Sequence, residues 1–191
     1  MLDLAVKTLN EKVPGCNAEI LKKEVGDSPI VVAAEKILQV CQVLKDDVEL
    51  DFQSLEVISG VDFLKKEASD KCPAQEERIE VNYMLTSFAK KHDLILKVKL
   101  GRSNPELDSV CAVWRSADFQ ERECYDMLGV NFKGHPDMRR ILCPEDWEGF
   151  PLRQDYVVQK EWHGMEVNPE SKMNLEDRAF EAINEKKHKK Q

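Results

Sequence analysis

The sequence has no apolar run long enough to cross a membrane. A spanning helix needs about 20 consecutive apolar residues, and the longest apolar run here, residues 29–34, suits only a buried strand. The first residues, MLDLAVKTLNEKV, also lack the basic start and long apolar stretch of a signal peptide. We therefore expect any association with a membrane to go through a partner protein.

An excess of basic residues is also missing. The chain has 28 Lys and Arg against 36 Asp and Glu, which gives a formal net charge of −8. General nucleic-acid binding needs a basic footprint, so nucleic acid is not expected as a partner. A hydrophobic content of 42% supports a real core, and 191 residues suit one domain plus an extension.

Six cysteines are present, but none belongs to a C-x-x-C pair. The usual spacing for structural zinc and for iron–sulfur ligation is therefore absent, and we expect no metal or cluster on this protein. Cys41, Cys111 and Cys124 fall within apolar patterns and are expected to act as small core residues. Without an export signal, the thiols should stay reduced.

Common catalytic motifs are absent too. G-x-S-x-G, the P-loop, H-E-x-x-H and G-x-G-x-x-G do not occur. The nearest approach to a catalytic cluster is His135 with Asp137 and Cys143. Because His135 precedes Pro136, it better suits a role in shaping a turn or donating to a carbonyl. A free-standing enzyme is therefore the weakest functional interpretation, and activity of the isolated protein would revive it.

Periodic apolar residues predict four helices and several strands. The helices are expected at residues 2–12 and 34–45, from Asn104-Pro105 through Trp114, and at residues 117–128, the last with an acidic capping box of Asp118 and Glu121 and a left-handed end at Gly129. The strands are expected at residues 18–25, 30–33 and 55–63, in a hairpin of residues 78–85 and 94–100 with its turn at residues 90–93, and around Val130 and Phe132. Residues 65–77 are expected to be a loop.

Together these elements predict an α+β fold. Residues 1–129 should form a two-layer sandwich of an antiparallel-rich mixed sheet with helices. Residues 130–191 should form an extended, irregular segment that binds a partner. Its end, EKKHKKQ, is a charged run expected to be disordered.

The stretch from residue 121 to 156 is the most informative part of the sequence. Proline and glycine interrupt regular structure after residue 133, yet aromatic residues and arginines remain. Such residues dominate interface energetics, which suggests a surface that wraps a partner. An ordinary loop packed on its own domain fits the residue pattern equally well, because loops often carry function on a rigid scaffold. The candidate interface residues are Arg139, Arg140, Trp147, Phe150, Arg153, Asp155 and Tyr156.

These residues also have simpler interpretations. Arg139 and Arg140 could be solvated charges, whose ion pairs contribute about 0–1 kcal/mol. Arg122 could pair with Asp126 at helical spacing. Trp147 could be a core residue beneath the segment. We favour partner contact for the arginines, because the planar guanidinium group suits carboxylates across an interface.

The same stretch closely resembles the signature of the C subunit of NADH-quinone oxidoreductase, respiratory complex I. The departures are mild: Met138 and Cys143 replace other apolar residues, Gln154 replaces a lysine, and Val157 replaces a proline. Residues 1–60 resemble the family only in pattern. The matched elements are Glu121-Arg122-Glu123, Tyr125-Asp126, Gly129, Phe132, His135-Pro136, Arg139-Arg140-Ile141-Leu142, Pro144, Asp146-Trp147, Gly149 and Pro151-Leu152-Arg153.

This resemblance implies a non-catalytic structural subunit of the peripheral arm of complex I, on the cytoplasmic side of the bacterial inner membrane. It implies that this protein binds no cofactor itself, while the assembled translocase uses NADH, FMN, iron–sulfur clusters and quinone and moves protons. The implied partners are the D and B subunits at the quinone site, with the C-terminal segment along the D subunit. The alternative is the equivalent scaffold subunit of a membrane-bound hydrogenase or F420H2 dehydrogenase complex.

Overall fold

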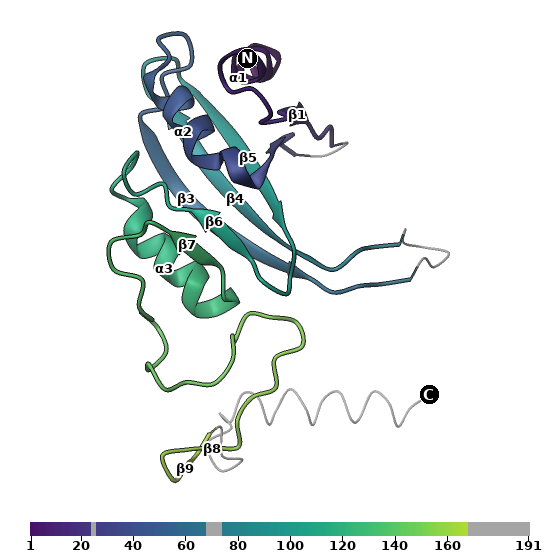
Figure 1. Cartoon of the computed structure of the whole chain (residues 1–191), viewed down its shortest axis with the longest axis vertical. Helices are drawn as coiled ribbons and strands as arrows, with labels where there is room; N and C mark the ends of the chain where they lie inside the picture. The colour runs from purple at the N-terminus through teal and green to yellow at the C-terminus, as the bar shows by residue number, and fades with distance from the viewer. Residues whose placement is uncertain (24–25, 68–73, 168–191) are drawn as a thin grey trace, which may run out of the picture. The chain divides into compact units, whose positions relative to one another are not determined.

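A five-stranded mixed sheet is the centre of the fold in a computed structural model that describes residues 1–23, 26–67 and 74–167 (Figure 1). Its strand order is β1-β2-β5-β4-β3, with β2 and β5 parallel and the other neighbours antiparallel. The predicted α+β class and the long hairpin are therefore confirmed. The strands are β1 (Glu19–Ile20), β2 (Ile30–Val32), β3 (Ser54–Phe63), β4 (Arg78–Ser87) and β5 (His92–Leu100).

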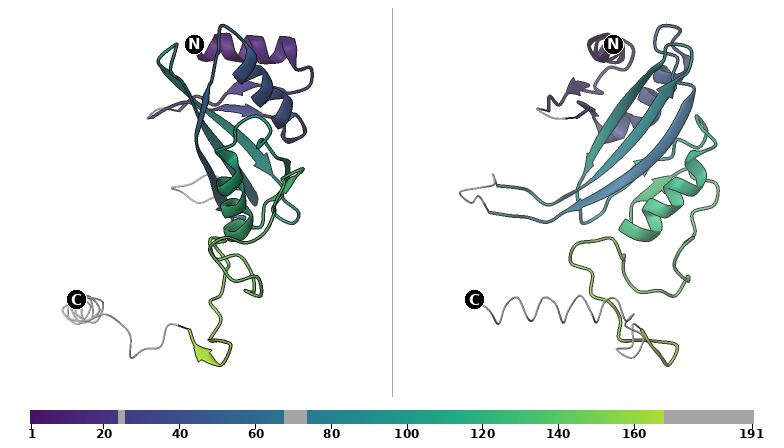
Figure 2. Two further views of the ribbon diagram at one scale, coloured as in Figure 1. Left: turned by 90° about the vertical axis from the view of Figure 1, so that its left-hand side faces the viewer. Right: turned by 180° about the vertical axis from the view of Figure 1, so that it is seen from behind.

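The helices form the second layer. Helix α2 (Ile37–Asp46), which follows a 3-10 turn at Ala34–Lys36, and helix α3 (Ala117–Leu128) lie on one face of the sheet, as the two views in Figure 2 show. Helix α1 (Leu2–Lys12) packs against α2 and β1. Between the layers lies a continuous core, because alternate residues of β4 and β5 point toward the helices. Its sheet residues include Ile79, Val81, Tyr83, Leu85, Leu94, Leu96 and Val98.

Strand β3 departs from the predicted alternation. A bulge between Leu55 and Val57 shifts its pairing with β4, so Leu55 and Ile58 are buried while Val57 and Val61 lie on the opposite, exposed face. A bulge inserts one extra residue and thereby exchanges the faces of all the residues that follow.

The predicted helix from Asn104-Pro105 to Trp114 is wrong. Residues Glu106–Asp108 form strand β6, which pairs in parallel with β7 (Asn131–Lys133). The Pro105 carbonyl accepts a hydrogen bond from the Asn131 N–H at 2.9 Å, so the backbone is already engaged in this pairing. The apolar residues that suggested the helix are still buried, but they lie in turns: Val110, Val113 and Trp114.

Both ends of α3 can be compared with their predicted caps. Gly129 ends the helix with φ of 76°, as predicted, and its N–H donates to the Tyr125 carbonyl. The capping box is wrong: Ser116 is the N-cap, and Glu121 reaches a loop outside the helix. Glu121 is therefore available to hold a different part of the protein.

Two compact units make up the chain, and the first ends at Tyr156. The second begins at Val157 and contains a small hairpin of β8 (Glu161–Trp162) and β9 (Met165–Glu166). The predicted boundary at residue 129 concerns which part folds by itself and stays a prediction. The predictions for the middle of the 65–77 loop and for the charged C-terminus lie outside the described residues.

Tyr83 provides a test of this core. Its hydroxyl is fully buried without a hydrogen-bond partner among the described residues, and burial raises the pKa of the phenol. A buried, unsatisfied polar group costs about 1–3 kcal/mol. Tyr83→Phe should therefore leave the free energy of unfolding unchanged or increase it, as measured by denaturant titration. Tyr156→Phe is the control and should lower it, because that hydroxyl accepts the Trp147 indole N–H at 3.0 Å. Destabilisation by Tyr83→Phe would show that its hydroxyl is satisfied.

Candidate partner interface

Helix α3 holds the irregular segment of residues 134–156, called the strap below, through a buried carboxylate. Asp126 Oδ2 accepts three backbone N–H groups in succession, from Ile141 at 3.1 Å, Leu142 at 2.7 Å and Cys143 at 2.8 Å. Its Oδ1 pairs with Arg140 Nη1 at 2.8 Å. The Asp126 side chain is fully buried. The strap therefore has a fixed backbone conformation at residues 140–143.

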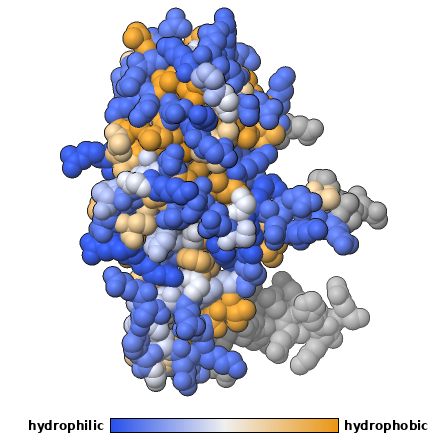
Figure 3. Space-filling model, viewed as in Figure 1, coloured by the Kyte–Doolittle hydropathy of each residue, from blue (hydrophilic) through white to orange (hydrophobic). Residues whose placement is uncertain are grey.

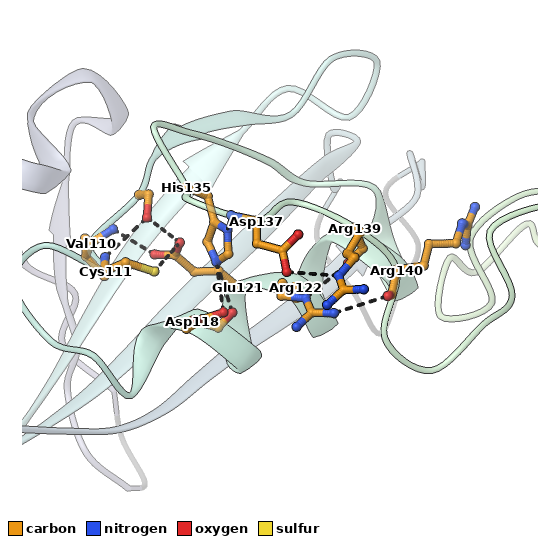
Figure 4. A network of polar contacts seen from close by, with 10 residues as sticks. Val110, Cys111, Asp118, Glu121, Arg122, His135, Asp137, Arg139 and Arg140 are labelled. Atoms are coloured by element: carbon orange, nitrogen blue, oxygen red, sulfur yellow. Dashed lines mark hydrogen bonds and ion pairs between the residues drawn. The ribbon is translucent and has the colours of Figure 1, made fainter.

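Arg122, one turn earlier on α3, holds the preceding residues. Its Nε donates to the Arg139 carbonyl at 3.2 Å and its Nη2 to the Arg140 carbonyl at 3.4 Å (Figure 4). The simple helical pair of Arg122 with Asp126 is thus not formed, because each side chain has partners in the strap. Helix α3 therefore holds consecutive parts of the strap. Arg122 donates to the carbonyls of residues 139 and 140, and Asp126 accepts the N–H groups of residues 141–143.

The last turn of α3 binds the far end of the strap. The Leu152 N–H donates to the Met127 carbonyl at 3.0 Å, and Arg153 Nε donates to the Leu128 carbonyl at 2.8 Å. The Arg153 guanidinium lies 4.6 Å from the centre of the Phe150 ring. A Cβ at Gly129 would come within 2.6 Å of that ring, so the glycine permits this close packing.

Strand β3 supplies a second buried carboxylate, Asp62. Arg102 binds it with two nitrogens, at 2.7 and 3.1 Å, and also contacts Asp155 of the strap. Gln154 donates its backbone N–H to Asp62 Oδ2 at 2.8 Å and its side-chain amide to the Asp62 carbonyl at 2.7 Å. Asp126 on α3 and Asp62 on β3 therefore anchor two separate parts of the strap, residues 140–143 and residue 154.

The predicted interface residues fall into two groups. Arg140, Arg153 and Asp155 have partners within the protein, as described above, and the Arg140 side chain is only 14% exposed. Arg139 is 63% exposed and binds only the neighbouring Asp137, at 2.9 Å, among the contacts given for its side chain. The aromatic residues are half-buried within the strap: Trp147, Phe150 and Tyr156.

Of the suggested catalytic cluster, His135 and Asp137 are in contact and Cys143 lies elsewhere. His135 Nδ1 accepts the Asp137 N–H at 3.0 Å, which places the proton on Nε2, 3.1 Å from the Asp118 carbonyl oxygen. The predicted role of His135 in a turn and toward a carbonyl is confirmed. Cys143 lies instead beside Asp126, to which it donates its N–H.

His135 lies close to Glu121 and Cys111 (Figure 4), and this trio has ligand atoms within 4.8 Å of one another. Glu121 already accepts the Ser109 hydroxyl at 2.6 Å and the Val110 N–H at 2.7 Å. Because the His135 nitrogens are also occupied, the trio is better explained as a buried polar contact between α3 and two loops than as a metal site.

Burial and hydrogen bonding have opposite effects on these carboxylates. Burial raises the pKa of Asp126 and of Asp62, but hydrogen bonds from the strap and the paired arginines outweigh it, so both pKa values lie below the ordinary value. For Glu121, burial dominates and raises the pKa despite the Ser109 and Val110 donors. The pKa shifts therefore favour the anionic form of the two strap anchors, whereas Glu121 is the one of these three carboxylates whose pKa is raised.

Two anchors were not predicted from the sequence. Nothing near Asp62 or Arg102 in the sequence indicates that either meets residues 154–155, since the contacts span more than 50 positions. Asp126 was identified only as part of the family signature. A single acidic residue in a helix gives no local signal for three backbone donors 15 to 17 positions away.

Comparison with known proteins identifies the family. The family described as respiratory-chain NADH dehydrogenase, 30 Kd subunit, matches residues 30–162. The present chain is a member of this family. The match includes both buried anchors and the whole strap, so the 30 kDa subunit family shares the region that defines this site.

Curated relatives of the 30 kDa subunit family agree. The C subunit of NADH-quinone oxidoreductase from Salinispora tropica is 41% identical over 172 residues, which cover 87% of this chain and 67% of the relative. The C subunit from Roseiflexus castenholzii is 45% identical over 136 residues, or 71% of this chain and 73% of the relative.

Solved structures share the fold. A trypsin-resistant fragment (1-134) of Nqo5 has a TM-score of 0.56 and 27% identity, covering 70% of this chain and 98% of the fragment. A chain from the membrane-bound sulfane sulfur reductase (MBS), an archaeal respiratory membrane complex, has a TM-score of 0.62. It is 24% identical and covers 82% of this chain and 85% of its own length, which shows the fold alone. Among the described residues of our protein, no helix is both long and apolar enough to span a membrane.

Removing the Asp126 charge should release the strap. Asp126→Asn leaves Arg140 without its ionic partner, and such a loss at a buried pair costs about 3–5 kcal/mol. Since cleavage follows the population of the open strap, trypsin should cut after Arg139, Arg140 or Arg153 about a hundredfold faster. Asp137→Asn is the matched control: this exposed carboxylate binds Arg139 and should change the rate little. Equal trypsin cleavage rates in the two variants would show that Asp126 does not anchor the strap.

Acid should release the same contact. Because the folded-state pKa of Asp126 lies below the unfolded value of about 3.9, its stabilisation is complete above that pH and is lost as pH falls through the folded pKa. The amide proton shifts of Leu142 and Cys143 should therefore stay constant from neutral pH to about 4 and change only below it. In Asp126→Asn this acid-dependent step should vanish. A midpoint at or above the ordinary carboxyl value would show that Asp126 is not stabilised as an anion.

Proposed function

We propose that this protein is a structural subunit of NADH-quinone oxidoreductase, and that it supports electron transfer from NADH to quinone, coupled to proton translocation, by packing beside the quinone-site subunits. Membership of the 30 kDa subunit family and relatives named as the C subunit, at 41 to 45% identity, support this assignment. The observation that carries it is the strap, which is fixed to the sandwich by Asp62 and Asp126 and presents exposed side chains outward.

The structure gives the strap residues different roles within this proposal. Arg140 and Arg153 hold the strap in shape, since Asp126 and the end of α3 bind them. Arg139 is the arginine best placed to meet a carboxylate of a partner. It is accompanied by two exposed apolar residues of the strap, Leu142 at 63% and Leu152 at 59% exposure. Arginine is the charged residue that protein interfaces favour, and their buried cores are apolar.

The partners we propose are the D and B subunits at the quinone site, with the strap along the D subunit. The protein would sit on the cytoplasmic side of the membrane and reach it through these partners. It would contribute contacts while NADH, FMN, iron–sulfur clusters and quinone are bound elsewhere in the complex. Cys16, Cys41 and Cys124 are free and buried, and we assign them to the hydrophobic core within this proposal.

An equivalent scaffold role in another membrane complex, such as a hydrogenase or F420H2 dehydrogenase, is the alternative. The fold likeness to a chain of the sulfane sulfur reductase complex supports it, since that complex carries the same fold in a different respiratory system. The higher identities of the NADH-quinone oxidoreductase relatives favour the first assignment. Identification of the subunits that co-purify from native membranes would decide between them.

Arg139→Ala should separate assembly from folding. If Arg139 pairs with a buried carboxylate of a partner, its loss costs about 2–5 kcal/mol of binding. The variant should melt at the wild-type temperature but recover far less of the D and B subunits from solubilised membranes, with reduced NADH-driven quinone reduction. Arg140→Ala should instead lower the melting temperature, because it breaks the pair with Asp126.

Arg115→Ala is the control for charge alone, because Arg115 is exposed and lies outside the strap. It should leave melting, assembly and activity unchanged. Normal assembly of Arg139→Ala would remove Arg139 from the proposed interface. Loss of folding in that variant would show that Arg139 serves the protein's own structure.

A further inference from the structure

The sheet face opposite α2 and α3 carries a groove of its own. This face lies in front when the molecule is seen from behind (Figure 2, right), and among the described helical residues only Leu2, at the start of α1, reaches the groove. The groove has a volume of about 600 Å³ and runs across the end of the β4–β5 hairpin from β3 toward residues 27–28. Its lining includes Glu56, Met84, Phe88, Asp93 and Ile95.

Met84 and Ile95 give this groove an apolar floor, and Val57, which lines a second groove, continues the apolar row onto β3. Val57 pairs with Met84, and Met84 pairs with Ile95, so the three side chains form a row across β3, β4 and β5. Val57 and Met84 are each 43% exposed, and Phe88 beyond them is 64% exposed. Figure 3 shows the other side of the molecule, with α2 and α3, where orange apolar atoms also gather among blue ones. Grouped exposed apolar residues mark interaction sites more often than scattered ones do.

A second groove, of about 340 Å³, follows the outer edge of β3. It lies between that strand and α3 and is lined by Val57, Met127 and Leu152 among others. Glu56 lines both grooves, so they meet at the β3 bulge. An apolar surface thus continues from Leu152 of the strap, around the edge of the sheet, to the face with Met84.

The edge of β3 is not free to pair with another strand in this region. Gln120 of α3 donates to the Glu56 carbonyl and accepts the Ile58 N–H, and the Ser116 hydroxyl donates to the Leu55 carbonyl. A partner must therefore bind through side chains, not by adding a strand to the sheet.

The charged residues that line the two grooves have one sign. Every charged residue that lines them is a carboxylate: Asp27, Glu56, Asp93 and Glu123. Cations also lie nearby without lining either groove: Lys99 is exposed on β5, and Lys90 and Lys91 are exposed in the hairpin turn. Arg78 and Lys97 both bind Glu80, at 2.7 and 2.5 Å. Electrostatic complementarity therefore favours a cationic partner.

We propose that this continuous surface binds a segment of another subunit that presents apolar side chains flanked by lysine or arginine. The segment crosses the β3 bulge, places its apolar residues on Val57, Met84 and Leu152, and pairs its cations with Glu56 and the other carboxylates. This inference rests on the proposed function, since the partner is a subunit of the same assembly, and it adds a second contact on the sheet face to that of the strap.

The test uses the full-length protein in its native membranes. A photo-reactive phenylalanine analogue at Met84 should cross-link, after illumination of the assembled complex, to a peptide that carries apolar residues next to Lys or Arg. Mass spectrometry of the cross-linked peptide gives its sequence. In parallel, Glu56→Lys should reduce recovery of the cross-linked subunit on the order of tenfold through charge repulsion.

Matched control variants test whether the loss of recovery is specific to the two grooves. Glu49→Lys makes the same charge change at an exposed position outside both grooves and should leave recovery unchanged. Met84→Ser should weaken recovery, whereas Val48→Ser should not, because Val48 is 84% exposed and lies outside the grooves. Melting temperatures of all four variants confirm that each is folded.

Four results would overturn the inference. In the cross-linking experiment they are normal assembly without a cross-link at Met84, a cross-link to lipid or to a second copy of this protein, and a linked peptide without Lys or Arg. In the variant experiment it is full recovery of the subunit with Glu56→Lys. If the wild-type protein does not co-purify with other NADH-quinone oxidoreductase subunits, the proposed function fails and this inference with it. If the complex assembles normally and nothing cross-links at Met84, only this inference fails and the proposed function is unaffected.

Discussion

The buried carboxylate of Asp126 is the interaction on which the irregular half of this fold depends. Proline and glycine prevent residues 134–156 from forming helix or strand, so their backbone N–H groups need partners elsewhere. Asp126 satisfies three of them and one arginine at once. Its anionic form is stabilised by these donors against the cost of burial, which fixes the strap without regular secondary structure.

Helix α3 acts as a binding surface for loops more than as a packing element. Glu121 holds the loop after β6, Arg122 the carbonyls of residues 139 and 140, and Asp126 the next three residues. These are among the residues that carry the resemblance to the family. The signature is therefore explained first by the protein's internal geometry, and its exposed neighbours, such as Arg139 and Leu142, remain available for the proposed partner contact.

The sequence allowed prediction wherever a pattern is local. Helices α1 and α3 and the β4–β5 hairpin follow from apolar periods of 3.6 and 2 that each span about ten residues. Strand β6 was mistaken for a helix because its partner lies at Asn131–Lys133, far along the sequence. The exposed Val57 depends on a bulge, and the anchor formed by Asp62, Arg102 and Asp155 joins three distant segments, so neither leaves a periodic signal.

Asp126 and Asp62 hold the strap in one conformation within the protein itself, which lowers the entropic cost of binding a partner. A segment that orders only on binding loses conformational entropy of about 1–2 kcal/mol per residue at that moment. Here the hydrogen bonds to Asp62 and Asp126 offset part of that loss before a partner arrives. Binding free energy can then come from relatively few exposed groups, because the surface is preorganised. Under the proposed function, internally bound residues such as Asp126 and Arg140 would therefore influence the affinity of the exposed residues that meet a partner.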